Sequence, residues 1–331
     1  MTISEIIQKY KNQLDYLDLE ILIANSLGKT REFVLTYPEF KIPSLKIENL
    51  KLKIARRVKG EPIAYILGHK EFYGLDFIVN NHTLVPRPET EMMVEMAIAD
   101  LQLTTYNLQQ DTTFIDVGTG SGNIIISIAN ELEKTKNSRV IPDLIRNPER
   151  STNLDSSLHG DDRVKYFGID ISKEALMIAK KNAKINGVNK KIKFFYGCLL
   201  EPFIGNCPPA SICEAFRAGK LEIGNSTIVI VANLPYLSKE IYNSALIDVK
   251  KFEPKSALYS AEAGLSHYKK LLKQIKKIYA PYSMLRIICF FEISPEQKPA
   301  LTKLIKSILP SAKIEFQKDL AKKWRACRIE L

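Results

Sequence analysis

The sequence predicts an α/β fold, in which a doubly wound, mostly parallel sheet follows a small N-terminal helical domain. Three observations favour this fold class. Strand-like and helix-like segments alternate from Pro88 onward, which is typical of parallel sheets with helices on both faces. A glycine-rich turn joins one of these strands to the helix after it. The first 70 residues instead show apolar positions at helical spacing.

The N-terminal segment, residues 1–70, is predicted to be a helical bundle. Glycine and proline interrupt its apolar pattern at Gly28, Pro38 and Pro43, where we expect turns between helices. Residues 71–87 come next, and the aromatic and β-branched side chains of 71–79 predict a short hairpin or an extended linker. Residues 88–331 then form the main domain.

In the main domain, the apolar patterns predict five helices and seven strands. We expect helices at 89–101, 122–133, 173–186, 265–279 and 296–308, and strands at 113–117, 165–170, 191–196, 227–232, 284–292, 313–317 and 325–330. Only a short gap separates the last two strands, so at least one of them is expected to run antiparallel.

Two stretches, residues 137–163 and 205–226, do not fit this alternation and are rich in Pro, Gly, Ser and Asn. Structureless stretches of that length are unusual in a compact domain. In a β-α-β unit that binds adenosine, the ribose-binding acid lies about 20 residues beyond the glycines, whereas Gly122 and Asp170 are 48 positions apart. We therefore interpret both stretches as surface inserts.

The composition is that of a soluble globular protein, with 45% hydrophobic and 26% charged residues. No apolar run approaches the roughly 20 residues of a membrane-spanning helix, and the first 15 residues lack the apolar core of a secretion signal. We predict a cytoplasmic protein with no membrane association. The five scattered cysteines form no C-x-x-C pair, so no metal site is predicted.

The net charge of +11 is concentrated near the C-terminus, where residues 264–331 hold 15 lysines and arginines against five acidic residues. This basic C-terminal region has two interpretations. It can bring the protein weakly into proximity with nucleic acid or the ribosome, or it can be a solvated lysine face on two helices.

A candidate cofactor site begins with Asp116-Val-Gly-Thr-Gly-Ser-Gly122, between a predicted strand and a predicted helix. Glycine lets the backbone turn sharply and approach a ligand closely. A carboxylate at the strand end attracts the ammonium and sulfonium charges of S-adenosylmethionine but repels a pyrophosphate, so we predict that cofactor. Asp170 ends the next strand and suits the ribose hydroxyls. The predicted cofactor residues are Asp116, Gly118, Thr119, Gly120, Gly122 and Asp170.

A candidate acceptor site is Asn233-Leu-Pro-Tyr236, which follows the strand at 227–232 and therefore faces the ligand crevice. The Asn233 side-chain oxygen and the Leu234 carbonyl can accept both N–H bonds of an NH2 group. Tyr236 can pack against a planar acceptor, and Pro235 stiffens the turn. We assign catalysis to Asn233, Pro235 and Tyr236, acting by orientation rather than as a general base.

Together, these motifs resemble the HemK/PrmC family of protein-glutamine N5 methyltransferases. The matching motifs are Ile66-Leu-Gly68, Glu71-Phe-Tyr-Gly74, Pro86-Arg-Pro-Glu-Thr-Glu91, Asp116 to Gly122, Asp170, Asn233-Leu-Pro-Tyr236 and Glu253-Pro254. The resemblance implies a seven-stranded Rossmann-like methyltransferase domain. It also implies methyl transfer from S-adenosylmethionine to the glutamine of the Gly-Gly-Gln loop in class 1 peptide chain release factors.

The resemblance also implies further site residues. The N-terminal helical domain would help to dock the release factor, and Arg87, Pro88, Glu89 and Thr90 would line the substrate side. Asn233 would contact the cofactor as well as the acceptor. Cys198 stands where the family usually has an aspartate that contacts the adenine, and Leu234 stands where it usually has a proline. We expect activity to survive the second change, because that position presents its backbone carbonyl.

Two alternative functions remain open at the level of sequence. An N6-adenine methyltransferase acting on RNA or DNA also uses Asn-x-Pro-Tyr, and the basic C-terminal region would suit phosphates. The segment Arg87 to Glu91 and the helical front domain argue against it. The other alternative is a catalytically degraded scaffold that binds a translation factor or RNA.

Overall fold

The computed structural model describes residues 1–104, 111–146, 164–204, 227–280 and 285–331. Within them, seven strands form one sheet in the order β5-β4-β3-β6-β7-β9-β8. The strands are β3 (Thr112–Val117), β4 (Val164–Asp170), β5 (Ile192–Tyr196), β6 (Thr227–Ala232), β7 (Arg286–Glu292), β8 (Lys313–Lys318) and β9 (Trp324–Glu330). Only β9 runs antiparallel to its neighbours β7 and β8 among these strands, as the short gap before it predicted.

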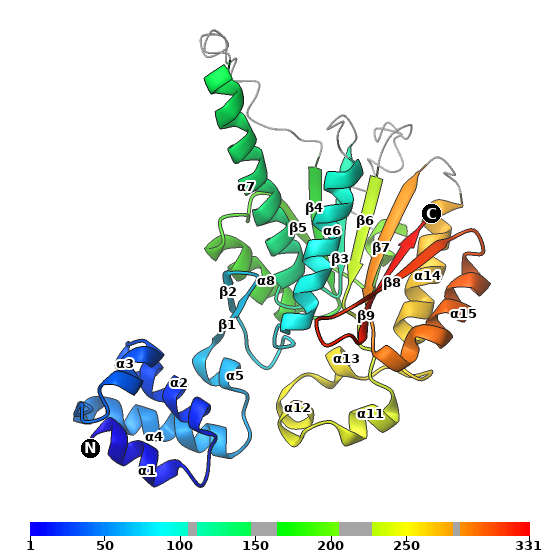
Figure 1. Cartoon of the computed structure of the whole chain (residues 1–331). Helices are drawn as coiled ribbons and strands as arrows, with labels where there is room; N and C mark the ends of the chain where they lie inside the picture. Colours follow the sequence, from blue (N-terminus) through cyan, green and yellow to red (C-terminus); the bar gives the residue numbers. More distant parts are fainter. Residues whose placement is uncertain (105–110, 147–163, 205–226, 281–284) are drawn as a thin grey trace.

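Helices cover both faces of this sheet (Figure 1), because alternate residues of its central strands are apolar on both sides. On one face α6 (Glu91–Thr104), α7 (Asn123–Arg146) and α8 (Lys173–Ile185) pack against alternate strand residues such as Phe114 and Val229. On the other, α9 (Glu201–Ile204), α14 (Ser266–Tyr279) and α15 (Lys298–Ile308) cover Ile115 and Ile230. The predicted α/β class is confirmed.

The N-terminal part consists of α1 (Ile3–Tyr10), α2 (Tyr16–Leu27), α3 (Arg31–Thr36), α4 (Ser44–Val58) and α5 (Ile63–Leu67). These helices enclose an apolar cluster of their own, with Ile6, Leu22 and Ile54 at its centre. Local signals set their ends. Thr2 forms a capping box with Glu5, and Gly28 ends α2 in the left-handed conformation that glycine adopts without strain.

A two-stranded antiparallel hairpin, β1 (His69–Phe72) and β2 (Leu75–Ile78), leads from α5 to the main sheet. The sequence left hairpin and linker open for residues 71–79, and the structure has the hairpin. A 3-10 turn, η1 (Pro88–Thr90), then precedes α6, and a second, η4 (Pro295–Gln297), precedes α15. Both turns carry proline in their first turn, where its missing N–H leaves no bond unmade.

The structure differs from the prediction in two places. The helix expected at 122–133 continues to Arg146, so residues 137–146, the first part of the stretch interpreted as an insert, are helical and not structureless. The composition of 137–163, rich in Pro, Gly, Ser and Asn, did not predict this continuation. The rest of that insert and all of 205–226 lie outside the described residues. Besides α9, the described residues contain three short helices between β6 and α14 that were not expected: α11 (Lys239–Ser244), α12 (Ile247–Phe252) and α13 (Lys255–Leu258).

These three helices lie at the same end of the sheet as the N-terminal helices (Figure 1). The two parts are in contact there, since the Arg57 guanidinium of α4 lies 3.8 Å from the Asp248 carboxylate of α12. In the parts of the chain that the structure describes, no helix combines the length and apolarity needed to cross a bilayer.

Candidate active site

The two predicted sites meet where the strand order of the sheet reverses. From β3 the chain adds β4 and β5 on one side, and then returns to place β6 and β7 on the other. Asp116 on β3 pairs in register with Gly168 on β4 and with Val231 on β6, so the parallel carboxyl ends of the three strands share one edge. Ligands of open α/β sheets bind in the crevice at this reversal point.

The glycine loop is held against β4 by its backbone. The N–H groups of Gly118 and Thr119 both donate to the Ile169 carbonyl at 2.9 Å. A Cβ atom at Gly122 would lie 2.7 Å from Ile126 Cδ1, and its φ of +82° also favours glycine. A Cβ atom at Gly118 would lie 3.0 Å from Leu234 Cδ2, so the glycine loop and the Asn-Leu-Pro-Tyr loop touch each other.

Asp116 is buried at the start of this loop, and one of its carboxylate oxygens has no hydrogen-bond partner. Its Oδ2 accepts a hydrogen bond from the Thr119 hydroxyl at 2.7 Å, whereas its Oδ1 has no hydrogen-bond partner. Burial raises the pKa of Asp116 to about 7, against the lowering effect of the Thr119 hydroxyl and of the Ile125 backbone. A buried carboxylate oxygen without a partner fits a cationic group, such as the ammonium of S-adenosylmethionine.

Asp170 lies beside the same loop and supports its backbone. Its Oδ2 accepts from the Gly120 N–H and its Oδ1 from the Ser172 N–H, each at 2.8 Å. Burial raises the pKa of Asp170, while these N–H groups lower it. Ser172, not Asp170, caps α8, since its hydroxyl accepts from the Ala175 N–H at 3.0 Å. Each oxygen keeps a second lone pair that can receive a ribose hydroxyl.

Two residues near Asp170, namely Ile171 and Cys198, lie on the side of the site where the adenine of the cofactor is expected. Ile171 follows Asp170 directly and is 62% exposed, which leaves an apolar face beside the ribose-binding candidate. The sequence analysis did not select Ile171, although an apolar residue directly after the acid was the available signal. Cys198 follows β5 and is half-buried against the apolar cluster on that face of the sheet, where burial raises the pKa of its thiol.

Asn182 on α8 links the hairpin to the glycine loop, and the sequence analysis did not select it either. Its Oδ1 accepts from the Ile78 N–H at 2.7 Å, and its Nδ2 donates to the Ile78 carbonyl and to the Ser121 carbonyl at 3.0 and 2.8 Å. The side chain is fully buried. An asparagine in the last turn of α8 therefore hydrogen-bonds both β2 and the glycine loop to this helix.

We expect Asn182→Ala to lower the free energy of unfolding by at least about 2 kcal/mol, because it leaves buried backbone groups of Ile78 and Ser121 without partners. Urea denaturation measures this change. Asn189→Ala, at an exposed turn residue beyond the same helix, serves as the matched control and should shift the unfolding free energy by less than about 0.5 kcal/mol. Equal effects of the two substitutions would contradict the linking role of Asn182.

The Asn-Leu-Pro-Tyr loop is held from three directions. The Asn233 Nδ2 donates to the Thr90 hydroxyl oxygen at 3.2 Å, and the Tyr236 hydroxyl donates to Glu292 Oε1 at 3.1 Å. The Tyr236 carbonyl accepts from Gln297 Nε2 at 3.1 Å. Leu234 is buried with its side chain against the glycine loop. In the described part of the chain, no hydrogen bond ends at the Asn233 side-chain oxygen or at the Leu234 carbonyl.

Glu292 is the site residue that the sequence analysis missed most clearly. It ends β7 next to Ile287–Phe291, a wholly apolar run, and is buried. A carboxylate at the carboxyl end of a central apolar strand was the signal, but the fold was needed to show what it meets. Burial raises the pKa of Glu292, and its hydrogen bonds with Thr90 and Tyr236 lower it.

The predicted substrate-side residues take separate positions. Thr90 is buried and bonded to Glu292 at 2.6 Å, whereas Glu89 is exposed. The Arg87 guanidinium pairs with the buried Glu253, whose other oxygen accepts from the Val85 N–H at 3.3 Å. This pair connects the segment before α6 to the end of α12. Thr90 therefore lies within the site, and Arg87 lies at its border.

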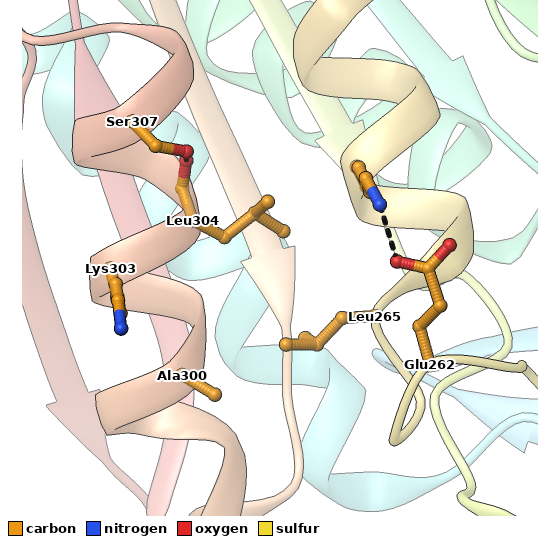
Figure 2. A pocket seen from close by; sticks show the side chains of 7 residues that line it. Glu262, Leu265, Ala300, Lys303, Leu304 and Ser307 are labelled. Atoms are coloured by element: carbon orange, nitrogen blue, oxygen red, sulfur yellow. Dashed lines mark hydrogen bonds and ion pairs between the residues drawn. The ribbon is translucent and has the colours of Figure 1, made fainter.

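A separate cavity of about 290 Å³ lies between α14 and α15 (Figure 2). Leu265, Ala300 and Leu304 form its apolar wall, and Glu262 at its rim forms an ion pair with Lys269 at 2.6 Å. None of the predicted site residues lines this cavity. It offers neither a glycine loop nor an unpartnered acid, so the candidate active site is taken to be the reversal point of the sheet.

Comparison with known proteins gives one consistent description. Residues 3–68 match the family described as the PrmC N-terminal domain. The chain is 30% identical to the release factor glutamine methyltransferase of Enterococcus faecalis, over 87% of this chain and 82% of that protein. It is 32% identical to the protein of the same name from Vibrio cholerae, over 80% and 73% of the two chains.

Among solved structures, the human methyltransferase 10 domain containing protein is 13% identical to this chain, with 77% of this chain and 88% of that chain covered and a TM-score of 0.44.

Proposed function

Because the chain belongs to the release factor glutamine methyltransferase family, we propose that it transfers a methyl group from S-adenosylmethionine to the side-chain amide nitrogen of the glutamine in the Gly-Gly-Gln loop of class 1 peptide chain release factors. One observation carries this proposal. The unpartnered Asp116 oxygen and the amide of Asn233 belong to loops that touch at the reversal point of the sheet.

The cofactor is held by residues of β3, β4 and the glycine loop. Asp116 Oδ1 receives the ammonium, and the positive φ values of Gly118, Gly120 and Gly122 bring the loop backbone close to the methionine end. Asp170 receives the ribose hydroxyls while its N–H partners keep its carboxylate in place. Ile171 offers its exposed side chain to the adenine, and Cys198 borders that end.

The acceptor amide is held by oxygen atoms. The Asn233 side-chain oxygen and the Leu234 carbonyl accept its two N–H groups, the Tyr236 ring packs on its face, and Pro235 keeps the two carbonyls in register. An amide nitrogen is a poor nucleophile, so orientation and exclusion of water account for the rate. Bound S-adenosylmethionine would supply a methyl group on a sulfonium that becomes neutral on transfer, and the methylated nitrogen then releases one proton to solvent.

The pKa of Asp116 leads to a pH dependence of cofactor binding. The carboxyl group has a pKa of about 7 in the free protein, and a bound ammonium favours its ionised form. Below pH 7, binding must therefore release a proton. Affinity for S-adenosylhomocysteine, measured by calorimetry, is expected to rise about tenfold from pH 6 to 7.5 and to level off above.

Asp116→Asn should bind S-adenosylhomocysteine more weakly and without this pH dependence, because the amide does not ionise. Asp319→Asn is a control for the loss of an acid elsewhere, since Asp319 pairs with Arg325 on β9. It should keep the pH dependence of the wild type. An Asp116→Asn variant with the wild-type profile would remove Asp116 from the site.

The N-terminal helical segment, residues 1–70, and the segment Arg87 to Thr90 are proposed to contact the release factor. Their support is position, since the N-terminal helices reach α12 through Arg57 and the Arg87 pair with Glu253 borders the acceptor loop. Proximity of the basic C-terminal region to nucleic acid or the ribosome stays a prediction. Some of its lysines have internal partners, such as Lys269 with Glu262 and Lys306 with the Ala312 carbonyl.

Mass spectrometry of a release factor tests the proposed function. After incubation with the protein and S-adenosylmethionine, the Gly-Gly-Gln peptide is expected to gain one methyl group on its glutamine. A release factor with glutamate at that position should gain none. Adenine-containing RNA and DNA oligonucleotides are assayed in parallel, and methylation of these instead of the release factor would replace the proposal with an N6-adenine methyltransferase.

A further inference from the structure

Glu292 is a buried carboxylate at the end of an apolar strand, where packing of the sheet alone would favour an apolar side chain. It is 2% exposed and continues the apolar β7. Burying a carboxylate costs free energy unless several hydrogen bonds satisfy it. Glu292 accepts two from side chains: Oε2 from the Thr90 hydroxyl at 2.6 Å, and Oε1 from the Tyr236 hydroxyl at 3.1 Å. Both donors belong to the acceptor side of the candidate site.

The bond between Thr90 and Glu292 determines which way the amide of Asn233 points. A threonine hydroxyl has one proton, and Thr90 donates it to Glu292. Toward Asn233 the Thr90 oxygen can then only accept, so the NH2 group of Asn233 must face it, at 3.2 Å. The Asn233 side-chain oxygen is thereby turned away from Thr90 and left as an acceptor.

Reversing the hydrogen bond between Thr90 and Glu292 would leave Asn233 unable to bind the acceptor amide. If Thr90 received its hydrogen bond from position 292, its own proton would go to the Asn233 oxygen. Asn233 would then present an NH2 group to the NH2 group of a substrate amide, and two donors repel each other. Tyr236 has the same dependence, because its hydroxyl also donates to Glu292. Only a group that accepts from both hydroxyls keeps the hydrogen bonds of Thr90 and Tyr236 in this direction.

We propose that Glu292 is a positioning residue of the methyl transfer: it sets the direction of the hydrogen bonds through Thr90 and Tyr236, so that Asn233 offers an oxygen to the acceptor amide. This inference rests on the proposed function, because it takes that amide to be the acceptor. Charged groups near Glu292 act in opposite directions. Arg325 lowers the pKa of the carboxyl group and Glu89 raises it.

Glu292→Gln is the direct test, because it conserves the shape of the side chain. The Thr90 and Tyr236 hydroxyls donate to different oxygens of Glu292, and glutamine replaces one of these oxygens with an NH2 group that cannot accept. We expect kcat/KM with a class 1 release factor to fall at least ~30-fold, which is about 2 kcal/mol. Affinity for S-adenosylhomocysteine should stay within twofold. Glu330→Gln removes an acid from the neighbouring β9, where Glu330 pairs with Arg286, and should stay within threefold of the wild type in both measurements.

Double-mutant cycles separate positioning from a structural role. In a Thr90→Val or a Tyr236→Phe background, the fold loss of kcat/KM caused by Glu292→Gln should be at least fivefold smaller than in the wild type. One of the two hydrogen bonds to Glu292 is already absent in these backgrounds. Full additivity in both backgrounds would overturn the inference. If Glu292→Gln does not fold, Thr90→Ser and Thr90→Val test the same relay, meaning the hydrogen bonds from Glu292 through Thr90 to Asn233. Thr90→Ser keeps the hydroxyl and should have nearly wild-type kcat/KM, whereas Thr90→Val should lose at least ~10-fold in kcat/KM.

Release factor binding in the presence of S-adenosylhomocysteine distinguishes failure of this inference from failure of the proposed function. A wild type that binds the release factor without methylating it would overturn the function. A lower release factor affinity in Glu292→Gln than in the wild type would then still support the positioning role. An active wild type with an unaffected Glu292→Gln variant would overturn the relay alone. No binding by the wild type would overturn both.

Discussion

Asn233→Ala is expected to lower methyl transfer at least ~100-fold, which corresponds to about 2.7 kcal/mol of transition-state stabilisation. The alanine removes the oxygen that we assign to the acceptor amide, and it also removes the NH2 group that contacts Thr90. No general base is assigned in this site, so orientation of the acceptor carries most of the rate enhancement.

The kinetics should show which step is affected. Turnover with the release factor is expected to fall while affinity for S-adenosylhomocysteine changes by only a few fold, because Asp116 and Asp170 still hold the cofactor. Asn189→Ala serves as the control, since it is the same substitution at an exposed turn residue. Near-wild-type turnover of Asn233→Ala would reject the assignment of the acceptor site.

Gly264→Ala is expected to have the second large effect, although Gly264 lies outside every motif of the site. A Cβ atom there would lie 2.0 Å from the Tyr236 carbonyl oxygen and 2.4 Å from Gln297 Nε2. Real Cβ atoms do not approach backbone oxygen that closely, so the Tyr236 carbonyl must move and its bond with Gln297 breaks. A displacement of about 1 Å in a positioned group can cost ~100-fold in rate, and we expect a loss of that order in kcat.

A glycine of the same conformation but without neighbours separates this clash from backbone strain. Gly187 has a φ of +74°, against +84° for Gly264, and a Cβ atom there would meet nothing within 4 Å. Gly187→Ala should therefore cost only the strain of a left-handed alanine, about 1 to 2 kcal/mol of stability, and keep its turnover. Loss of activity to the same extent in both variants would show that strain, not the position of Tyr236, is responsible.

The comparison of prediction with structure separates local features from contacts between distant residues. The strands and most helices of the main domain were predicted within a few residues, and an antiparallel strand was predicted among the last two. These features depend on side-chain period, on capping and on glycine, all of which act over a few neighbouring residues. Composition alone was a weaker guide, since residues 137–146 continue α7 although the stretch is rich in Pro, Gly, Ser and Asn.

The site was predictable to the same extent and for the same reason. The glycine loop and Asn233 to Tyr236 follow strands directly, so the rule that ligands bind at carboxyl ends places both. Asn182 and Gln297 could not be selected, because their importance lies in backbone groups of other segments: Ser121 is 61 residues from Asn182, and Tyr236 is 61 residues from Gln297.

By itself, the sequence determined the α/β class, the strand ends that carry the two loops and the types of side chain that they present, because each of these depends on short-range geometry. Only the tertiary structure decided which oxygen and which proton face each other. Thr90 meets Glu292 across 202 positions and Asn233 across 143. The direction of a hydrogen bond depends on both partners, so it is defined only when packing brings them together.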